Sequence, residues 1–202
     1  MPRSSGLSFL LRWLVVTAIF CSGEVHALDP ARSVRQYVHR IWQTDLGLPA
    51  VRAIAQSRDG YLLLGGQGGL MKFDGVRFSP VNTDWVRNIL EDGRGRIWAG
   101  TNDSGIIRTD HGTVKRFTRL DGLPSDHVTC LVLDHNGDVW ACTLDGLVRF
   151  SGDNIHVYQT RQGLPVNGLL SACLAQDGTL WMGTNTPLIA SWNGSMFQSI
   201  TL

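Results

Sequence analysis

The chain has 202 residues, a formal net charge of +1 at pH 7 and four cysteines. Nucleic-acid binding usually requires a clustered excess of basic side chains, so this near-neutral balance argues against a nucleic-acid partner. The cysteines include no CxxC pair, which argues against the commonest zinc and redox motifs.

The first 27 residues have the features of an export signal. Arg3 and Arg12 precede an apolar run at residues 13–21, and Val25-His26-Ala27 places small residues where a signal peptidase cleaves. The apolar run is shorter than the roughly 20 residues of a transmembrane helix. We therefore expect cleavage after Ala27 and a periplasmic or secreted chain, which meets a membrane only through a parent protein or an uncleaved signal.

The mature chain, residues 28–202, consists of repeats. A phrase close to DGxLWxGT occurs four times, and the glycines that open it are Gly60, Gly95, Gly137 and Gly178. They are 35, 42 and 41 residues apart, which is the period of a propeller blade. We therefore expect a single β-propeller repeat domain.

Each repeat divides into four short apolar or alternating runs separated by turn residues, a pattern typical of β-strands. In the third repeat these runs cover residues 127–133, 138–143, 147–150 and 155–160. No run has the period of a helix. The sequence thus predicts an all-β propeller whose four four-stranded blades cover approximately residues 50–81, 86–118, 127–160 and 168–201.

One strand lacks a blade of its own. Residues 37–44 (YVHRIWQT) match the fourth strand of a repeat, but no matching first three strands precede them. The fourth repeat already has its own last strand at residues 196–201. We therefore expect four blades plus an extra N-terminal outer strand, an incomplete propeller that further blades or another chain would complete.

Large residues recur at one position of the second strand. Trp98, Trp140 and Trp181 hold this position in three repeats, and Leu63 holds it in the first. Such regular recurrence favours packing between blades over ligand binding, because each ring buries roughly 150–250 Å².

The mature cysteines are Cys130, Cys142 and Cys173. They are odd in number, and Cys142 stands where Gly100 and Gly183 stand in other repeats. The other two lie in apolar strand patterns. We expect buried thiols rather than a disulfide or a metal site.

Further motifs recur in a fixed order around the glycine phrase. A GLP tripeptide opens three repeats at residues 47–49, 122–124 and 163–165, and segments such as GLMKFDG (69–75) and GLVRFSG (146–152) follow the phrase. This pattern, over residues 28–202, resembles the two-component regulator propeller repeat of periplasmic sensor regions in bacterial hybrid histidine kinases. The resemblance implies part of a seven-bladed propeller, a sensory role, and histidine kinase activity only in a parent protein outside this chain.

Candidate ligand contacts lie on one face of the expected propeller. The connection between blades and the loop between second and third strands share that face, where loops surround a concave channel mouth. The candidates are Arg52, Asp103, Asp126, His127 and Asn167. We expect them to face an unknown small molecule or glycan, with no cofactor.

No set of residues in the sequence predicts catalysis or a metal site. Residues 134–138 (DHNGD) resemble a calcium loop but lack its closing bidentate Glu, so we expect an ordinary hairpin turn.

The expected function is a periplasmic sensor segment of a two-component regulator that recognises a ligand. The alternatives are a protein-interaction scaffold or truncated remnant of a larger regulator, and a propeller enzyme such as a lyase or hydrolase, which would need convergent acid and base groups on the loop face.

Overall fold

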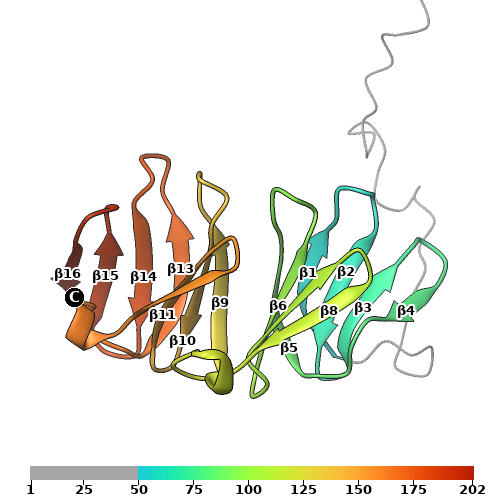
Figure 1. The fold of residues 1–202 in the computed structure, drawn as a ribbon, viewed down its shortest axis with the longest axis horizontal. Helices are drawn as coiled ribbons and strands as arrows, with labels where there is room; N and C mark the ends of the chain where they lie inside the picture. The colour runs from blue at the N-terminus through green and yellow to red at the C-terminus, as the bar shows by residue number, and fades with distance from the viewer. Residues whose placement is uncertain (1–49) are drawn as a thin grey trace, which may run out of the picture. The chain divides into compact units, whose positions relative to one another are not determined.

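A computed structural model describes residues 50–202 and confirms the all-β prediction (Figure 1). The described residues form four antiparallel sheets, each of four strands in sequence order. Blade 1 contains β1 Val51–Gln56, β2 Leu62–Gly66, β3 Gly69–Phe73 and β4 Phe78–Pro80, and blade 2 contains β5 Val86–Glu91, β6 Ile97–Thr101, β7 Ile106–Asp110 and β8 Thr113–Phe117. Blade 3 contains β9 Val128–Leu133, β10 Val139–Thr143, β11 Gly146–Ser151 and β12 Asn154–Tyr158, and blade 4 contains β13 Leu169–Leu174, β14 Leu180–Thr184, β15 Leu188–Trp192 and β16 Phe197–Thr201.

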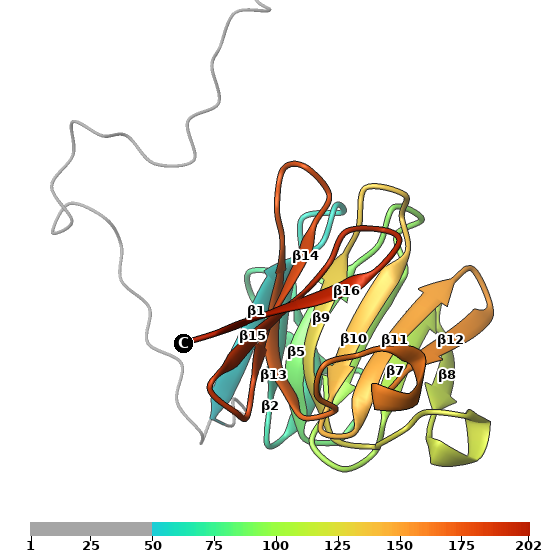
Figure 2. The same ribbon diagram turned by 90° about the vertical axis from the view of Figure 1, so that its left-hand side faces the viewer.

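The blades contact one another through their first strands, and β1, β5, β9 and β13 lie next to each other in turn (Figure 2). Glycine in the second strand permits this close approach. A Cβ at Gly65 would lie 2.5 Å from Cγ1 of Val86, and one at Gly100 would lie 2.7 Å from Cγ1 of Val128. A larger residue at either position would push the neighbouring blade away.

Two short 3-10 helices, which the sequence analysis did not predict, connect the later blades. They are η3 Arg119–Asp121 and η4 Thr160–Gln162. The GLP motif ends each of them: Gly122 and Gly163 are left-handed, with φ of 101° and 91°. The following leucines, Leu123 and Leu164, are 4% and 2% exposed and join the core between blades. GLP therefore combines a helix-ending glycine with a buried leucine.

Two of the three recurring tryptophans, Trp98 and Trp140, pack between blades as expected. Trp98 is fully buried between blades 2 and 3, and its ring centroid is 5.0 Å from that of Phe150. Trp140 is 3% exposed between blades 3 and 4, with its centroid 6.4 Å from that of Trp192. Trp181 is partly exposed because it faces outward from blade 4, where the described residues place no further blade.

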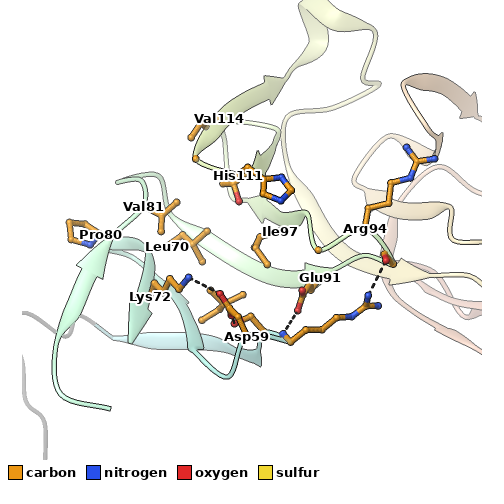
Figure 3. Close-up of a pocket in the computed structure, with 17 residues that line it drawn as sticks. Asp59, Leu70, Lys72, Pro80, Val81, Glu91, Arg94, Ile97, His111 and Val114 are labelled. Carbon is orange, nitrogen blue, oxygen red and sulfur yellow. Dashed lines mark hydrogen bonds and ion pairs between the residues drawn. The ribbon is translucent and has the colours of Figure 1, made fainter. Parts of the chain in front are cut away.

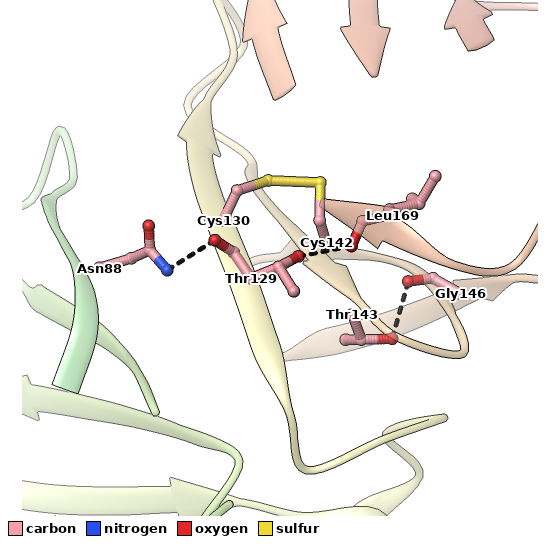
Figure 4. The surroundings of a disulfide bond; sticks show 7 residues. All are labelled: Asn88, Thr129, Cys130, Cys142, Thr143, Gly146 and Leu169. Atoms are coloured by element: carbon pink, nitrogen blue, oxygen red, sulfur yellow. Dashed lines mark hydrogen bonds between the residues drawn. A yellow bond between two sulfur atoms is a disulfide. The ribbon is translucent and has the colours of Figure 1, made fainter. Parts of the chain in front are cut away.

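The prediction of buried thiols is wrong. Cys130 and Cys142 form a disulfide within blade 3 (Figure 4). The antiparallel register of β9 and β10 sets these two residues directly opposite each other, with their Cα atoms 5.0 Å apart, a spacing suited to a disulfide. Sequence spacing alone does not reveal that register. Cys173 is a free thiol but is exposed.

Exposed apolar residues mark the two outer sheet faces of the array. On blade 1, Ile54 is 68% exposed and Leu62 is 37% exposed, whereas Leu170 and Ile200 of blade 4 are 49% and 53% exposed. The predicted outer strand at residues 37–44 and the predicted export signal lie outside the described residues. Within residues 50–202 no helix has the length and apolar character needed to cross a membrane.

Candidate functional site

The connections between blades and the loops between second and third strands lie on the same face, as expected. Backbone hydrogen bonds join the two sets. Asn102 N donates to Trp85 O at 2.9 Å, Leu144 N donates to His127 O at 3.3 Å, and Asn185 N donates to the oxygen of Gly168 at 3.0 Å. This face is called the mouth face below, and the opposite face, with the turns that join first to second strands, is called the hairpin face.

Two of the predicted site residues meet on the mouth face. His127 Nδ1 lies 3.8 Å from Asp103 Oδ1, and Asp103 is the more exposed of the two. Arg87 completes the cluster: its Nη1 lies 2.9 Å from Asn102 Oδ1 and 3.0 Å from His127 Nε2. Because a guanidinium only donates, Nε2 accepts the bond, and the ring proton belongs on Nδ1, which faces Asp103.

The sequence analysis missed Arg87, although a signal for it exists. Arg87 is the second residue of β5, and Arg52 is the second residue of β1. Arg52 contacts the next blade in a similar way, with its guanidinium carbon 5.9 Å from the ring centroid of Trp85. The indole Nε1 of Trp85 is buried and has no hydrogen-bond partner among the described residues. Cations therefore line adjacent inner strands of this face.

Asp126 and Asn167 hold equivalent positions and both stabilise a blade connection. Asp126 Oδ1 accepts a hydrogen bond from Arg119 N at 2.8 Å, and Asn167 Oδ1 accepts one from Thr160 N at 2.9 Å. Asp and Asn both carry a side-chain oxygen, and in each 3-10 helix this oxygen accepts the hydrogen bond of the first residue's backbone N–H. Asn167 Nδ2 also donates to Asp145 Oδ1 at 3.0 Å. A role of these two residues in ligand binding stays a prediction.

Blade 2 replaces the GLP connection with an ion pair. Asp84 precedes β5 as Asp126 precedes β9, and its Oδ2 lies 2.6 Å from Arg116 Nη2. The hydrogen bond from Arg116 lowers the pKa of Asp84, and the carboxylate in turn raises the pKa of Arg116. The charge of Asp84 is thus compensated locally by Arg116.

The described residues contain no group of three His, Cys, Asp or Glu side chains that could hold a metal ion. The calcium-like segment at residues 134–138 is a hairpin turn. Asp134 accepts hydrogen bonds from the backbone nitrogens of Asn136 and Asp138, at 2.8 and 2.9 Å, and from the indole of Trp140 at 2.9 Å. Its oxygens therefore serve the turn and the tryptophan.

The fold defines the class of protein: an array of four-stranded β-propeller blades. Within this class, the sequence model described as the two-component regulator propeller matches residues 80–103 and 122–145. These two segments therefore match the repeat that the sequence resembles. No curated protein sequence matches the chain.

Solved structures with similar folds include extracellular domains described as parts of hybrid two-component systems and a lyase. An extracellular domain from B. thetaiotaomicron, described as part of a hybrid two-component system, is 22% identical with a TM-score of 0.71, over 84% of this chain and 25% of that one. A second such domain is 19% identical with a TM-score of 0.64, over 75% and 24%. Virginiamycin B lyase from Staphylococcus aureus is 20% identical with a TM-score of 0.63, over 75% and 55%.

These identities show a shared fold alone. The chain spans about a quarter of the length of the two extracellular domains. The activity and partners of a whole regulator are therefore matters for proposal.

Proposed function

We propose that this chain is the ligand-recognising propeller segment of an exported two-component regulator. The observation that carries the proposal is the mouth-face cluster of Arg87, Asn102, Asp103 and His127, built on repeats of that family. The ligand is a small molecule or glycan, and its binding biases the packing of a longer protein toward a signalling state.

The chemistry of the cluster suits a polar ligand. Arg87 offers a cation and several N–H donors, while Asp103 is exposed and offers acceptor oxygens. Sugar hydroxyls both donate and accept hydrogen bonds, so a neighbouring donor and acceptor can hold adjacent hydroxyls. Strand β5 fixes the position of Arg87, whereas Asp103 belongs to the loop between β6 and β7, where residues are free to vary.

The test is a thermal-shift screen of the purified chain against defined oligosaccharides and small periplasmic metabolites. A ligand at about 100 times its Kd stabilises the folded state by about 2.7 kcal/mol, which corresponds to roughly 5–10 °C for a domain of this size. We expect Arg87→Gln and Asp103→Ala to abolish the shift. The control Arg161→Gln, on the exposed η4 helix, keeps it.

A screen in which no compound changes the melting temperature would contradict ligand recognition and favour the scaffold or remnant alternative. Conversion of a ligand during the assay would favour the enzyme alternative, in view of the lyase that shares the fold. A shift that survives both cluster variants would show that the ligand binds elsewhere.

A further inference from the structure

A deep groove lies between blades 1 and 2, away from the mouth-face cluster (Figure 3). Its volume is about 740 Å³, within the range of small-molecule sites. Leu70 and Val81 of blade 1 face Ile97 of blade 2 across it, and the hairpin-face turns at residues 57–60 and 92–95 contribute to its rim. The groove therefore has an apolar interior and a polar rim.

The groove exists because the interface between blades 1 and 2 lacks the aromatic residues of the other interfaces. Strand register identifies three equivalent positions in each interface. Between blades 2 and 3 they hold Trp98, Phe117 and Phe150, and between blades 3 and 4 they hold Trp140, Tyr158 and Trp192. Between blades 1 and 2 they hold Leu63, Val81 and Thr109, and all three line the groove.

The missing rings define the shape of what would fill the groove. In the other two interfaces the rings of each trio lie with their centroids 5.0–6.4 Å apart. Leucine, valine and threonine leave that ring-sized space open between two rigid sheets. An aromatic ring would therefore find apolar contacts on both sides at a site that already matches its dimensions.

A cation that accompanies the missing tryptophan is still present. The residue opposite each tryptophan is Arg108 in blade 2 and Arg149 in blade 3, and each guanidinium lies over the ring, 5.4 and 5.2 Å from its centroid. In blade 1 the corresponding residue is Lys72, opposite Leu63. Lys72 Nζ already lies 3.6 Å from the ring centroid of Tyr61 in the same blade, and a ligand ring beside Leu63 would meet the same cation.

The rim of the groove favours an acidic ligand. Three cations line it, Arg58, Lys72 and Arg94, against two carboxylates, Asp59 and Glu91. Lys72 Nζ pairs with Asp59 Oδ2 at 3.0 Å, and Glu91 accepts a bond from the backbone nitrogen of Arg58 at 2.8 Å. The side chain of Arg94 extends away from Lys72 (Figure 3). A ligand carboxylate would therefore lie at the ammonium of Lys72.

We propose that the groove between blades 1 and 2 binds an aromatic carboxylic acid, with the ring between Leu63, Val81 and Thr109 and the carboxylate toward Lys72. This site is independent of the mouth-face cluster, which lies on the other face. An experiment can therefore contradict the proposal for one site without contradicting the proposal for the other.

The experiment titrates the purified full-length chain with 2-naphthoate and measures heat and protein NMR shifts. We expect saturable binding of one molecule per chain. Leu63→Trp restores the ring of the other blades and should weaken binding at least tenfold without lowering the melting temperature. The matched control, Val76→Trp, adds the same ring at a 71% exposed turn outside the groove and should leave binding unchanged.

Two analogues separate the contributions of ring and charge. Cyclohexanecarboxylate keeps the charge without the aromatic face, and 2-naphthalenemethanol keeps the ring without the charge. We expect both to bind at least several-fold more weakly than 2-naphthoate, and Lys72→Gln to weaken 2-naphthoate more than the alcohol. Equal binding of either analogue overturns the proposed ligand class.

The location of the ligand is tested by groove-filling substitutions in blade 1 and in blade 2. If Leu63→Trp fails to fold, Thr109→Phe fills the groove from blade 2 and should have the same effect. Absence of naphthoate binding, or undiminished binding by a folded groove-filling variant, overturns the proposal.

Discussion

At the scale of single residues, a buried carboxylate fixes the tryptophan of blade 2. Asp92 is 1% exposed, and its Oδ2 accepts hydrogen bonds from Trp98 Nε1 at 2.8 Å and from Arg96 Nε at 2.6 Å. Its Oδ1 accepts bonds from the backbone nitrogens of Arg94 and Arg96 at 2.9 and 3.1 Å. Asp134 repeats the bond to the indole in blade 3. The wedge between blades thus depends on an ionised aspartate.

We predict that Asp92 makes the fold sensitive to acid. Burial by itself would raise the pKa of Asp92, but hydrogen bonds from Trp98, Arg94 and Arg96 outweigh it and lower the pKa below the usual value. A carboxyl whose pKa is lower in the folded state stabilises that state above its unfolded pKa of about 3.9. This stabilisation is lost as the pH falls further.

The measurement is urea unfolding between pH 7 and pH 2.5. Asp92→Asn should cost about 2 kcal/mol at pH 7, because it disturbs a buried charged hydrogen-bond network, and should flatten the decline in acid. Asp177→Asn, at an exposed turn of blade 4, is the control. It should change the unfolding free energy at pH 7 and its decline in acid much less. An unchanged acid profile in Asp92→Asn would show that other groups control it.

At the scale of secondary-structure elements, the sequence predicts the strands but not which two cysteines form the disulfide. The third repeat was predicted at residues 127–133, 138–143, 147–150 and 155–160, and the structure has β9 Val128–Leu133, β10 Val139–Thr143, β11 Gly146–Ser151 and β12 Asn154–Tyr158. Turn glycines and apolar alternation are local signals, which the sequence displays directly. The facing of Cys130 and Cys142 depends on the β9–β10 register, which pairs Val139 with Leu133 next to the turn and continues regularly to the two cysteines.

We predict that the disulfide stabilises blade 3 substantially. Its two cysteines are 12 residues apart, and closing a loop of this size in the unfolded chain is worth about 3 kcal/mol. A chain with Cys130→Ser and Cys142→Ser should lose about that much unfolding free energy, whereas the exposed Cys173→Ser should lose little. Alkylation before reduction, followed by mass spectrometry, should modify Cys173 alone of these three. Modification of Cys130 without reductant would contradict the bond.

At the scale of the whole molecule, the four described blades have two outer faces. One corresponds to the face that contacts a preceding blade, and the other to the face that contacts a following blade. Ile54 and Leu62 on blade 1 correspond to residues that contact the preceding blade elsewhere, such as Ile89. Trp181 and Ile200 on blade 4 correspond to residues that contact the following blade. The outer face of blade 4 therefore resembles the faces that contact a following blade inside the array. It could pack in the same way against the outer face of blade 1 in another chain.

We predict head-to-tail self-association through these faces. Such a contact is heterologous, so it can extend beyond a dimer unless it closes a ring or further blades cover it. Sedimentation velocity over a range of concentrations should show growing species. Leu62→Lys and Ile200→Lys should each suppress them by placing a charge in the contact, while Leu120→Lys, fully exposed on η3, should not. Concentration-independent monomers would contradict the prediction.

The sequence by itself determined the repeat, the strands, the packing role of Trp98 and Trp140 and the resemblance to the two-component regulator propeller repeat, because the period and turn residues are local and recur four times. It also placed Asp103 and His127 on one face. Only the tertiary structure showed that Arg87 joins them, that Asp126 and Asn167 hold 3-10 helices, and that a groove lies beside Leu63. These features depend on strand register and on contacts between blades, which join residues far apart in the chain.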